Sequence, residues 1–117
     1  MTVQTQPLLR PIDLGGVVLD TPVILAPMSG VTDLPFRRLV RRLGAGLVVS
    51  EMIASWAMVR ENDTTLRMAE VADAGGPNAV QLAGCDPQVM AEAARIAVDR
   101  GADLIDINSG CLVKKVV

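Results

Sequence analysis

Two residues that could take part in chemistry stand close together near the end of the chain, in the stretch DINSGC. An apolar, strand-like run leads to Asn108, and Cys111 follows after one serine and Gly110. A glycine permits the tight turn that would aim the cysteine at a ligand. A cysteine thiol is mostly protonated near neutral pH, and the chain contains no histidine that could act as its base. We therefore interpret Cys111 as an acid rather than a protease-type nucleophile.

Further candidates stand where other apolar runs end. Continuous apolar runs cover residues 22–28, 45–52, 78–84 and 102–108, and such runs are typical of strands in a parallel sheet that is covered on both faces. The carboxyl ends of these strands would meet at one rim. Amide, thioether and apolar side chains there suit a flat, partly polar ligand. The rim residues are Ala26, Pro27, Met28, Ser50, Glu51, Met52, Gln81, Asn108 and Cys111.

Helical patterns connect these runs. Residues 33–44 predict an amphipathic helix that begins at Asp33 and buries Phe36, Leu39, Val40 and Leu43. Residues 86–101 predict a second helix, begun by Asp86 and buried through Met90, Ala93, Ala94 and Ala97. The connection between residues 53 and 77 is less regular, with a helix, a turn near Asn62 and a short helical piece. Ahead of all this, residues 11–20 predict a hairpin around Gly15 and Gly16.

The resulting order, a hairpin followed by β-α-β-α-β-α-β, predicts an α/β fold. Such units form either a doubly wound sheet or a barrel. No GxGxxG motif follows the first strand, which disfavours a dinucleotide-binding Rossmann unit. At 117 residues the chain is one domain at most.

Composition narrows the class of protein. Half of the residues are hydrophobic and the net charge is −2, which disfavours disorder and a general attraction to nucleic acid. Two cysteines without histidine or a CxxC motif predict no metal site; Cys85 reads as a small buried or half-exposed thiol. No signal-peptide pattern or apolar run of about 18 residues is present, so we expect a cytoplasmic protein that does not cross a membrane.

Three blocks together resemble the N-terminal half of the tRNA-dihydrouridine synthases: LAPMSGVTDLPFRRLVRRLGAGLVVSEM, QLAGCDP and DINSGCLVKKVV. The resemblance runs from about Ile12 to the last residue. It implies a partial (β/α)8 TIM barrel with about four parallel strands, in which residues 1–117 form the N-terminal half of an FMN-binding domain and residues 1–11 are a flexible N-terminus. It also implies an FMN-dependent oxidoreductase that reduces uridine in tRNA with NAD(P)H.

The same resemblance implies a role for individual residues. Ala26, Pro27 and Met28 would lie along the flavin, and Gln81 would hydrogen-bond its isoalloxazine ring. Asn108 would lie near the substrate uracil, and Cys111 would donate the proton that accompanies hydride transfer. Leu112 stands where the family has proline, a departure expected to leave Cys111 more mobile.

Several alternatives stay open at this point. Arg37, Arg38, Arg41 and Arg42 are interpreted as a solvated helix face, with a tRNA-backbone patch as the alternative, and Lys114 and Lys115 are better candidates for phosphate contact. Glu51 could contact a ligand or pair with an arginine. A TIM barrel needs about 250 residues, so we expect a truncated family member, either inert or self-associating through open sheet edges. Another FMN barrel enzyme, of the dihydroorotate dehydrogenase type, is the remaining alternative.

Overall fold

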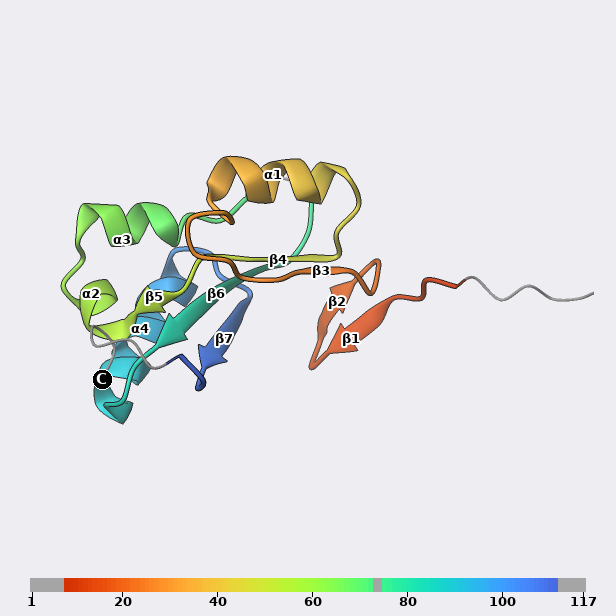
Figure 1. The fold of residues 1–117 in the computed structure, drawn as a ribbon. Helices are drawn as coiled ribbons and strands as arrows, with labels where there is room; N and C mark the ends of the chain where they lie inside the picture. The colour runs from red at the N-terminus through yellow and green to blue at the C-terminus, as the bar shows by residue number, and fades with distance from the viewer. Residues whose placement is uncertain (1–7, 73–74, 112–117) are drawn as a thin grey trace, which may run out of the picture.

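The computed structural model describes residues 8–72 and 75–111. The predicted flexible segment therefore lies largely outside the described residues, as do Leu112, Lys114 and Lys115. The elements follow the predicted order and are shown in Figure 1. They are β1 (Ile12–Leu14), β2 (Val17–Leu19), β3 (Ile24–Leu25), α1 (Leu34–Arg42), β4 (Leu47–Val49), β5 (Ile53–Ala54), α2 (Ser55–Val59), α3 (Asp63–Met68), β6 (Asn78–Ala83), α4 (Pro87–Asp99) and β7 (Leu104–Asn108).

A parallel sheet organises the molecule. Within the described residues its strands run in the order β3-β4-β6-β5, and β7 pairs with β6. The pairing of β3 with β4, of β4 and β5 with β6, and of β6 with β7 is parallel throughout. Helices connect these strands, so the prediction of an α/β fold that forms part of a (β/α)8 barrel is confirmed. The antiparallel hairpin β1-β2 was also predicted correctly.

The register reveals that β4 and β5 are two parts of one strand, separated by a bulge. Val49 is opposite Ala79, whereas Ile53 is opposite Leu82. Four steps along the first strand thus match three steps along β6, which is the one-residue excess that defines a β-bulge. The bulge comprises residues 50–52. With β4 and β5 taken together, four strand positions follow one another in chain order, as predicted.

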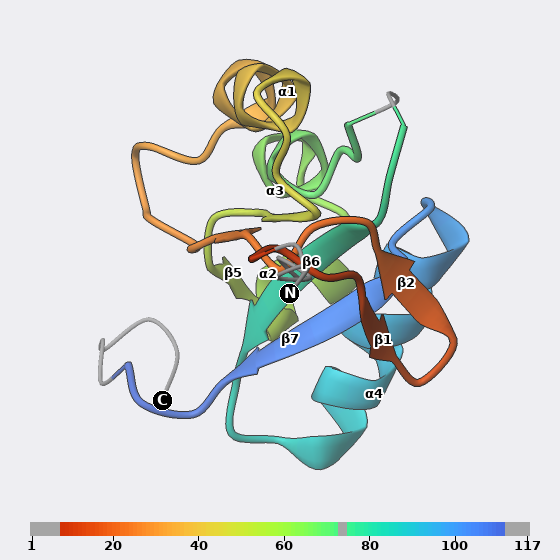
Figure 2. The same ribbon diagram turned by 90° about the vertical axis from the view of Figure 1, so that its right-hand side faces the viewer.

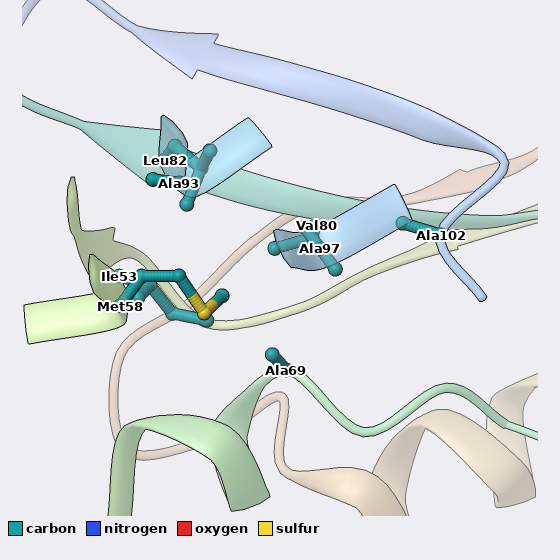
Figure 3. Packing of buried hydrophobic residues seen from close by; sticks show 8 residues of the cluster. All are labelled: Ile53, Met58, Ala69, Val80, Leu82, Ala93, Ala97 and Ala102. Atoms are coloured by element: carbon teal, nitrogen blue, oxygen red, sulfur yellow. The ribbon is translucent and has the colours of Figure 1, made fainter. Parts of the chain in front are cut away.

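Helices pack on the outer face of the sheet through small side chains. Val80 and Leu82 of β6 contact a cluster that includes Ala93 and Ala97 of α4. Figure 3 shows this cluster, in which Ile53 and Met58 lie beside each other. Alanine on the buried face of α4 lets the helix lie close to the sheet. Met90 and Ala94, the other predicted contacts, are half-buried.

The inner face of the sheet packs against the hairpin. Leu19 of β2 joins Leu47, Val49 and Ala79 in a second apolar cluster. The arrowheads of β6 and β7 point away from the hairpin in Figure 1, and Figure 2 shows it beside these strands. The hairpin therefore covers the amino-terminal end of the sheet and leaves the carboxyl ends accessible. An apolar hollow of about 430 Å³ opens on this inner face and reaches Pro27 and Asp106.

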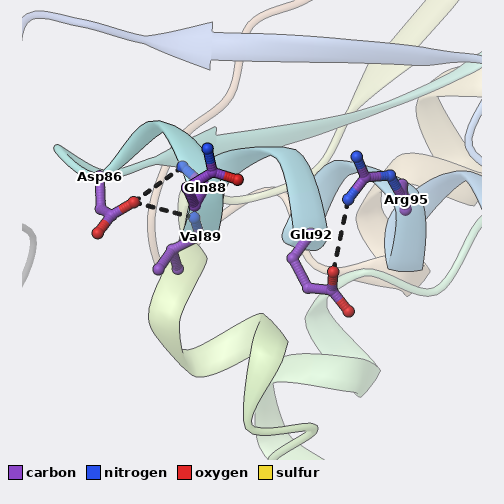
Figure 4. Close-up of polar contacts among 5 residues, drawn as sticks. All are labelled: Asp86, Gln88, Val89, Glu92 and Arg95. Atoms are coloured by element: carbon purple, nitrogen blue, oxygen red, sulfur yellow. Dashed lines mark hydrogen bonds and ion pairs between the residues drawn. The ribbon is translucent and has the colours of Figure 1, made fainter.

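Helices α1 and α4 begin where predicted. The Asp33 carboxylate accepts a hydrogen bond from the backbone N–H of Phe36 at 3.0 Å. The Asp86 carboxylate accepts two, from Gln88 at 2.8 Å and Val89 at 3.2 Å, as Figure 4 shows. These bonds satisfy backbone donors that have no partner inside the helix. None of the helices in the described ranges has the length and apolar character needed to cross a membrane.

The buried face of α1 differs from the prediction. Leu39 and Leu43 are 45% and 79% exposed, whereas Arg37 and Arg41 are 1% and 8% exposed. Phe36 and Val40, the other residues of the predicted stripe, are half-buried, and Val40 packs against the core. The predicted burial of Leu39 and Leu43 and the interpretation of these two arginines as a solvated face are therefore wrong. The reason is a surplus of backbone carbonyls around the helix. Arg41 donates to the carbonyl oxygens of Ala45, Gly46 and Pro77, and a guanidinium has the five N–H donors that such an arrangement requires.

Candidate functional site

The predicted amide residues meet at the carboxyl ends of β6 and β7. Gln81 on β6 is buried, with 7% exposure. Asn108, the last residue of β7, lies opposite Ala83 in the register and so shares the inner face with Gln81. The Nδ2 atom of Asn108 donates a long hydrogen bond of 3.4 Å to Oε1 of Gln81. Two residues that are 27 positions apart in the sequence are thus in direct contact.

Asn108 also fixes the backbone that leads to Cys111. Its Oδ1 atom accepts hydrogen bonds from the backbone N–H groups of Gly110 and Cys111, both at 3.0 Å. This side-chain-to-backbone turn is a common use of asparagine. Cys111 is half-buried and has a free thiol. The side chain of Asn108 therefore fixes the backbone of Cys111, the predicted acid three positions later in the sequence.

Sequence reasoning missed Asp106, which lies two positions before Asn108 on β7 and shares the inner face with it. Its Oδ2 atom accepts a hydrogen bond of 2.6 Å from Nε2 of Gln81, and the two residues are opposite each other in the β6-β7 register. The signal was present in the sequence, because a carboxylate two positions before Asn108 in a parallel strand must face the same way.

The bulge after β4 supplies three further residues. Ser50 is fully buried; its hydroxyl accepts a hydrogen bond from the backbone N–H of Gln81 at 3.0 Å and donates to the carbonyl of Glu51 at 2.8 Å. The Sδ atom of Met52 lies 3.5 Å from Nδ2 of Asn108. Because the extra residue reverses the alternation of side chains, Met52 reaches the inner face. Regular pairing from Val49 onward would direct it outward.

Glu51 connects the bulge to the loop after β3. Its Oε1 atom accepts a hydrogen bond of 2.6 Å from the backbone N–H of Gly30, which has a φ of +77°. Glu51 therefore holds backbone in a conformation that favours glycine. Its charge also acts on Arg37: burial lowers the pKa of that guanidinium, and the nearby Glu51 carboxylate partly opposes the shift.

The backbone of Met28, at the start of this loop, is held by hydrogen bonds to Thr32. Thr32 is fully buried, and its hydroxyl accepts from the N–H of Met28 at 3.1 Å and donates to the Met28 carbonyl at 3.2 Å. Arg37 then fixes Thr32 by donating from Nε to its carbonyl at 3.0 Å. The backbone is anchored while the Met28 side chain remains 41% exposed. Of the residues before it, Pro27 is half-buried and Ala26 is exposed.

Amide, thioether and apolar side chains gathered in this way suit a flat, partly polar ligand. Neutral amides from Gln81 and Asn108 converge on one rim, beside the thioether of Met52 and the hollow that Pro27 lines. Among residues 8–72 and 75–111, no three His, Cys, Asp or Glu side chains are grouped so that they could hold a metal ion. Cys85 is exposed, so the prediction of a buried or half-exposed thiol is wrong; it follows Gly84 into the loop before α4.

Comparison with known proteins shows which family this chain resembles in sequence. The family model described as dihydrouridine synthase (Dus) matches residues 24–117. A probable tRNA-dihydrouridine synthase of Rickettsia bellii is 57% identical over 107 residues, which are 91% of this chain and 33% of that protein. A probable tRNA-dihydrouridine synthase of Rhodobacter capsulatus is 56% identical over 106 residues, 90% of this chain and 33% of the relative.

A third relative, tRNA-dihydrouridine synthase B of Pseudomonas syringae pv. tomato, is 52% identical over 104 residues, with 88% of this chain and 31% of the relative covered. The chain thus spans about a third of the length of the curated relatives that it matches.

Proposed function

The chain belongs to the dihydrouridine synthase family, and from that premise we propose that it provides the N-terminal part of a site that reduces uridine to 5,6-dihydrouridine in tRNA. The observation that carries the proposal is the hydrogen-bonded contact of Gln81, Asn108 and the Cys111 backbone at the carboxyl ends of two adjacent parallel strands. In barrel enzymes, this end of the strands bears the active site.

FMN is the cofactor that this rim would hold. Ala26, Pro27 and Met28 would lie along the ring, and Gln81 would bond its polar edge. When bound and reduced by NAD(P)H, FMN would supply the hydride for reduction of the uracil ring. The contribution of the chain is to orient the two rings, because Thr32 and Asn108 fix the backbone on either side of the rim.

Cys111 would complete the reduction as the proton donor. Saturating the uracil double bond requires one hydride and one proton; the thiol gives its proton to the ring carbon and is left as a thiolate, which takes up a proton from solvent. Asn108 would lie near the uracil while it fixes the cysteine backbone. A proton donor held in place in this way raises the rate by positioning as well as by acidity.

The substrate proposal favours tRNA over a free pyrimidine. The relatives at 52–57% identity are named for tRNA, which supports this choice over the dihydroorotate dehydrogenase alternative. A tRNA substrate would also place the protein in the cytoplasm.

The test combines cofactor binding with a cysteine comparison. FMN is titrated into the purified protein, and reduction of unmodified tRNA by the protein at its natural length is measured for Cys111→Ala and for Cys85→Ala. We expect saturable FMN binding by all variants, a loss of activity of about 10²–10⁴-fold for Cys111→Ala, and no loss for Cys85→Ala, whose thiol is exposed in the loop between β6 and α4. Full activity of Cys111→Ala would refute the assignment of the proton donor, and absence of FMN binding would refute the flavin proposal.

A further inference from the structure

A directional series of hydrogen bonds runs across the rim. The backbone N–H groups of Gly110 and Cys111 donate to Oδ1 of Asn108. Nδ2 of Asn108 donates to Oε1 of Gln81, and Nε2 of Gln81 donates to Oδ2 of Asp106. In every bond of the series the donor thus lies on the side of the cysteine backbone and the acceptor on the side of the carboxylate.

The direction follows from the chemistry of the two ends. Backbone N–H groups can only donate, so Asn108 must present its oxygen to them and its NH₂ group to Gln81. At the other end an ionised carboxylate can only accept, so Gln81 must present its NH₂ group to Asp106. Both constraints give Gln81 the same orientation. The usual ambiguity between the oxygen and nitrogen of an amide side chain is therefore removed on chemical grounds.

This orientation determines what Gln81 can offer to a ligand. Its Oε1 atom faces Asn108, and one hydrogen of its NH₂ group is used by Asp106. The second hydrogen of the NH₂ group is the remaining donor. Through this hydrogen Gln81 would act as a donor toward a carbonyl oxygen or an imine nitrogen of a flat ring, while its Oε1 atom keeps one lone pair beside Asn108.

We propose that Asp106 is a positioning residue for the flavin site, which orients the Gln81 amide as a donor and, through Asn108, steadies the backbone of Cys111. This inference rests on the proposed function for the identity of the ligand. The bond is short, at 2.6 Å, and a hydrogen bond to a charged acceptor is roughly twice as strong as a neutral one. The residue acts through Gln81, with no contact to the reacting atoms required of it.

The first test measures FMN affinity in four proteins: wild type, Asp106→Leu, Asp106→Asn and Asp103→Asn. Leucine removes the acceptor, whereas asparagine retains a neutral one. Asp103 is the matched control, because it lies just before the start of β7, where its carboxylate accepts a hydrogen bond of 2.9 Å from the backbone N–H of Asn78. We expect the Kd for FMN to rise roughly tenfold in Asp106→Leu and by a smaller factor in Asp106→Asn. The FMN affinity of Asp103→Asn should be unchanged.

A double-mutant cycle with Gln81→Met separates positioning from general stability. If Asp106 acts through Gln81, the Asp106→Leu change has little further effect on FMN affinity once Gln81 is replaced. Additive losses, or equal FMN affinities for Asp106→Leu and wild type, would overturn the inference. Thermal melts of each variant check that any change in affinity exceeds the change in folded population.

A second measurement needs no flavin. The side-chain amide signals of Gln81 and Asn108, and hydrogen exchange at the backbone N–H groups of Gly110 and Cys111, are followed by NMR. Asp106→Leu should shift the Gln81 signals and speed exchange at Gly110 and Cys111, and Asp103→Asn should do neither. Unchanged signals would overturn the inference even if FMN binds. If the signals change but the wild-type protein does not bind FMN, the hydrogen-bond series is supported and the flavin proposal is refuted.

Discussion

Replacing Arg37 should destabilise the fold far more than replacing Arg42, although both lie on α1. The Arg37 guanidinium is 1% exposed and donates to three backbone carbonyls: Thr32 at 3.0 Å, Glu70 at 2.6 Å and Met68 at 3.1 Å. It thereby joins the start of α1 to the end of α3. Alanine removes the donors and leaves these carbonyls without a side-chain partner.

The expected magnitude follows from the burial of each bond. The bond to Thr32 is buried and the other two are part-buried. At about 1.5–3 kcal/mol for the first and about 0.5–1.5 kcal/mol for each of the others, Arg37→Ala costs about 4 kcal/mol. This is a large share of the roughly 5–15 kcal/mol that stabilises a typical domain.

Urea unfolding measures this difference. With an m-value of about 1.5 kcal/mol per molar urea, a loss of 4 kcal/mol lowers the midpoint by roughly 2.7 M. Circular dichroism and the fluorescence of Trp56 provide two probes whose agreement tests two-state behaviour. Arg37→Lys, which cannot reproduce the fork of donors, should fall between wild type and Arg37→Ala and serves if the alanine variant does not fold.

Arg42→Ala is the matched control, because Arg42 is exposed in the last turn of the same helix. Its loss should stay within the few tenths to 1 kcal/mol of a helix-dipole interaction. Equal midpoints for Arg37→Ala and Arg42→Ala would refute the reasoning that burial of the guanidinium reflects a structural role.

Two further predictions concern the rim and the sheet edges. Glu51→Ala should weaken FMN binding roughly tenfold by releasing the backbone of Gly30, whereas Glu51→Gln keeps an acceptor and should bind nearly as wild type; equal affinities for alanine and glutamine would contradict this role. Within the described residues β7 pairs only with β6, and Ile107 is 66% exposed. The 117-residue chain should therefore elute from size exclusion above its monomer mass of 12.4 kDa, and Ile107→Lys should reduce this association; a monomeric wild type would argue against it.

Local signals in the sequence predicted much of the fold. Apolar runs located the strands, and Asp33 and Asp86 marked the helix starts, because a capping side chain acts on backbone within three residues of itself. The buried face of α1 was not predictable in this way. The carbonyls that Arg37 satisfies at Met68 and Glu70 belong to a segment more than 30 positions away, and no periodicity within α1 reports on them.

The candidate site, like the fold, could be predicted only in part from the sequence. The order of motifs placed Gln81, Asn108 and Cys111 on one rim, and the contacts between them agree. The assigned roles in binding flavin and donating a proton stay predictions. Strand alternation alone indicates that Asp106 faces the same way as Asn108. Only the pairing of β7 with β6 shows that it lies opposite Gln81.

The bulge of residues 50–52 shows how one extra residue shapes this site. Val49 packs inward against Ala79, and Ile53, four positions later, packs outward with Leu82. Regular alternation would place both on the same face. The extra residue lets the apolar core continue on the helix side while Met52 reaches Asn108 on the inner side. It also places the Ser50 hydroxyl where it accepts a hydrogen bond from the backbone N–H of Gln81. The irregularity in the strand is thus what joins β4, β6 and β7 at the rim, and a regular strand could serve the core or the site at this position, not both.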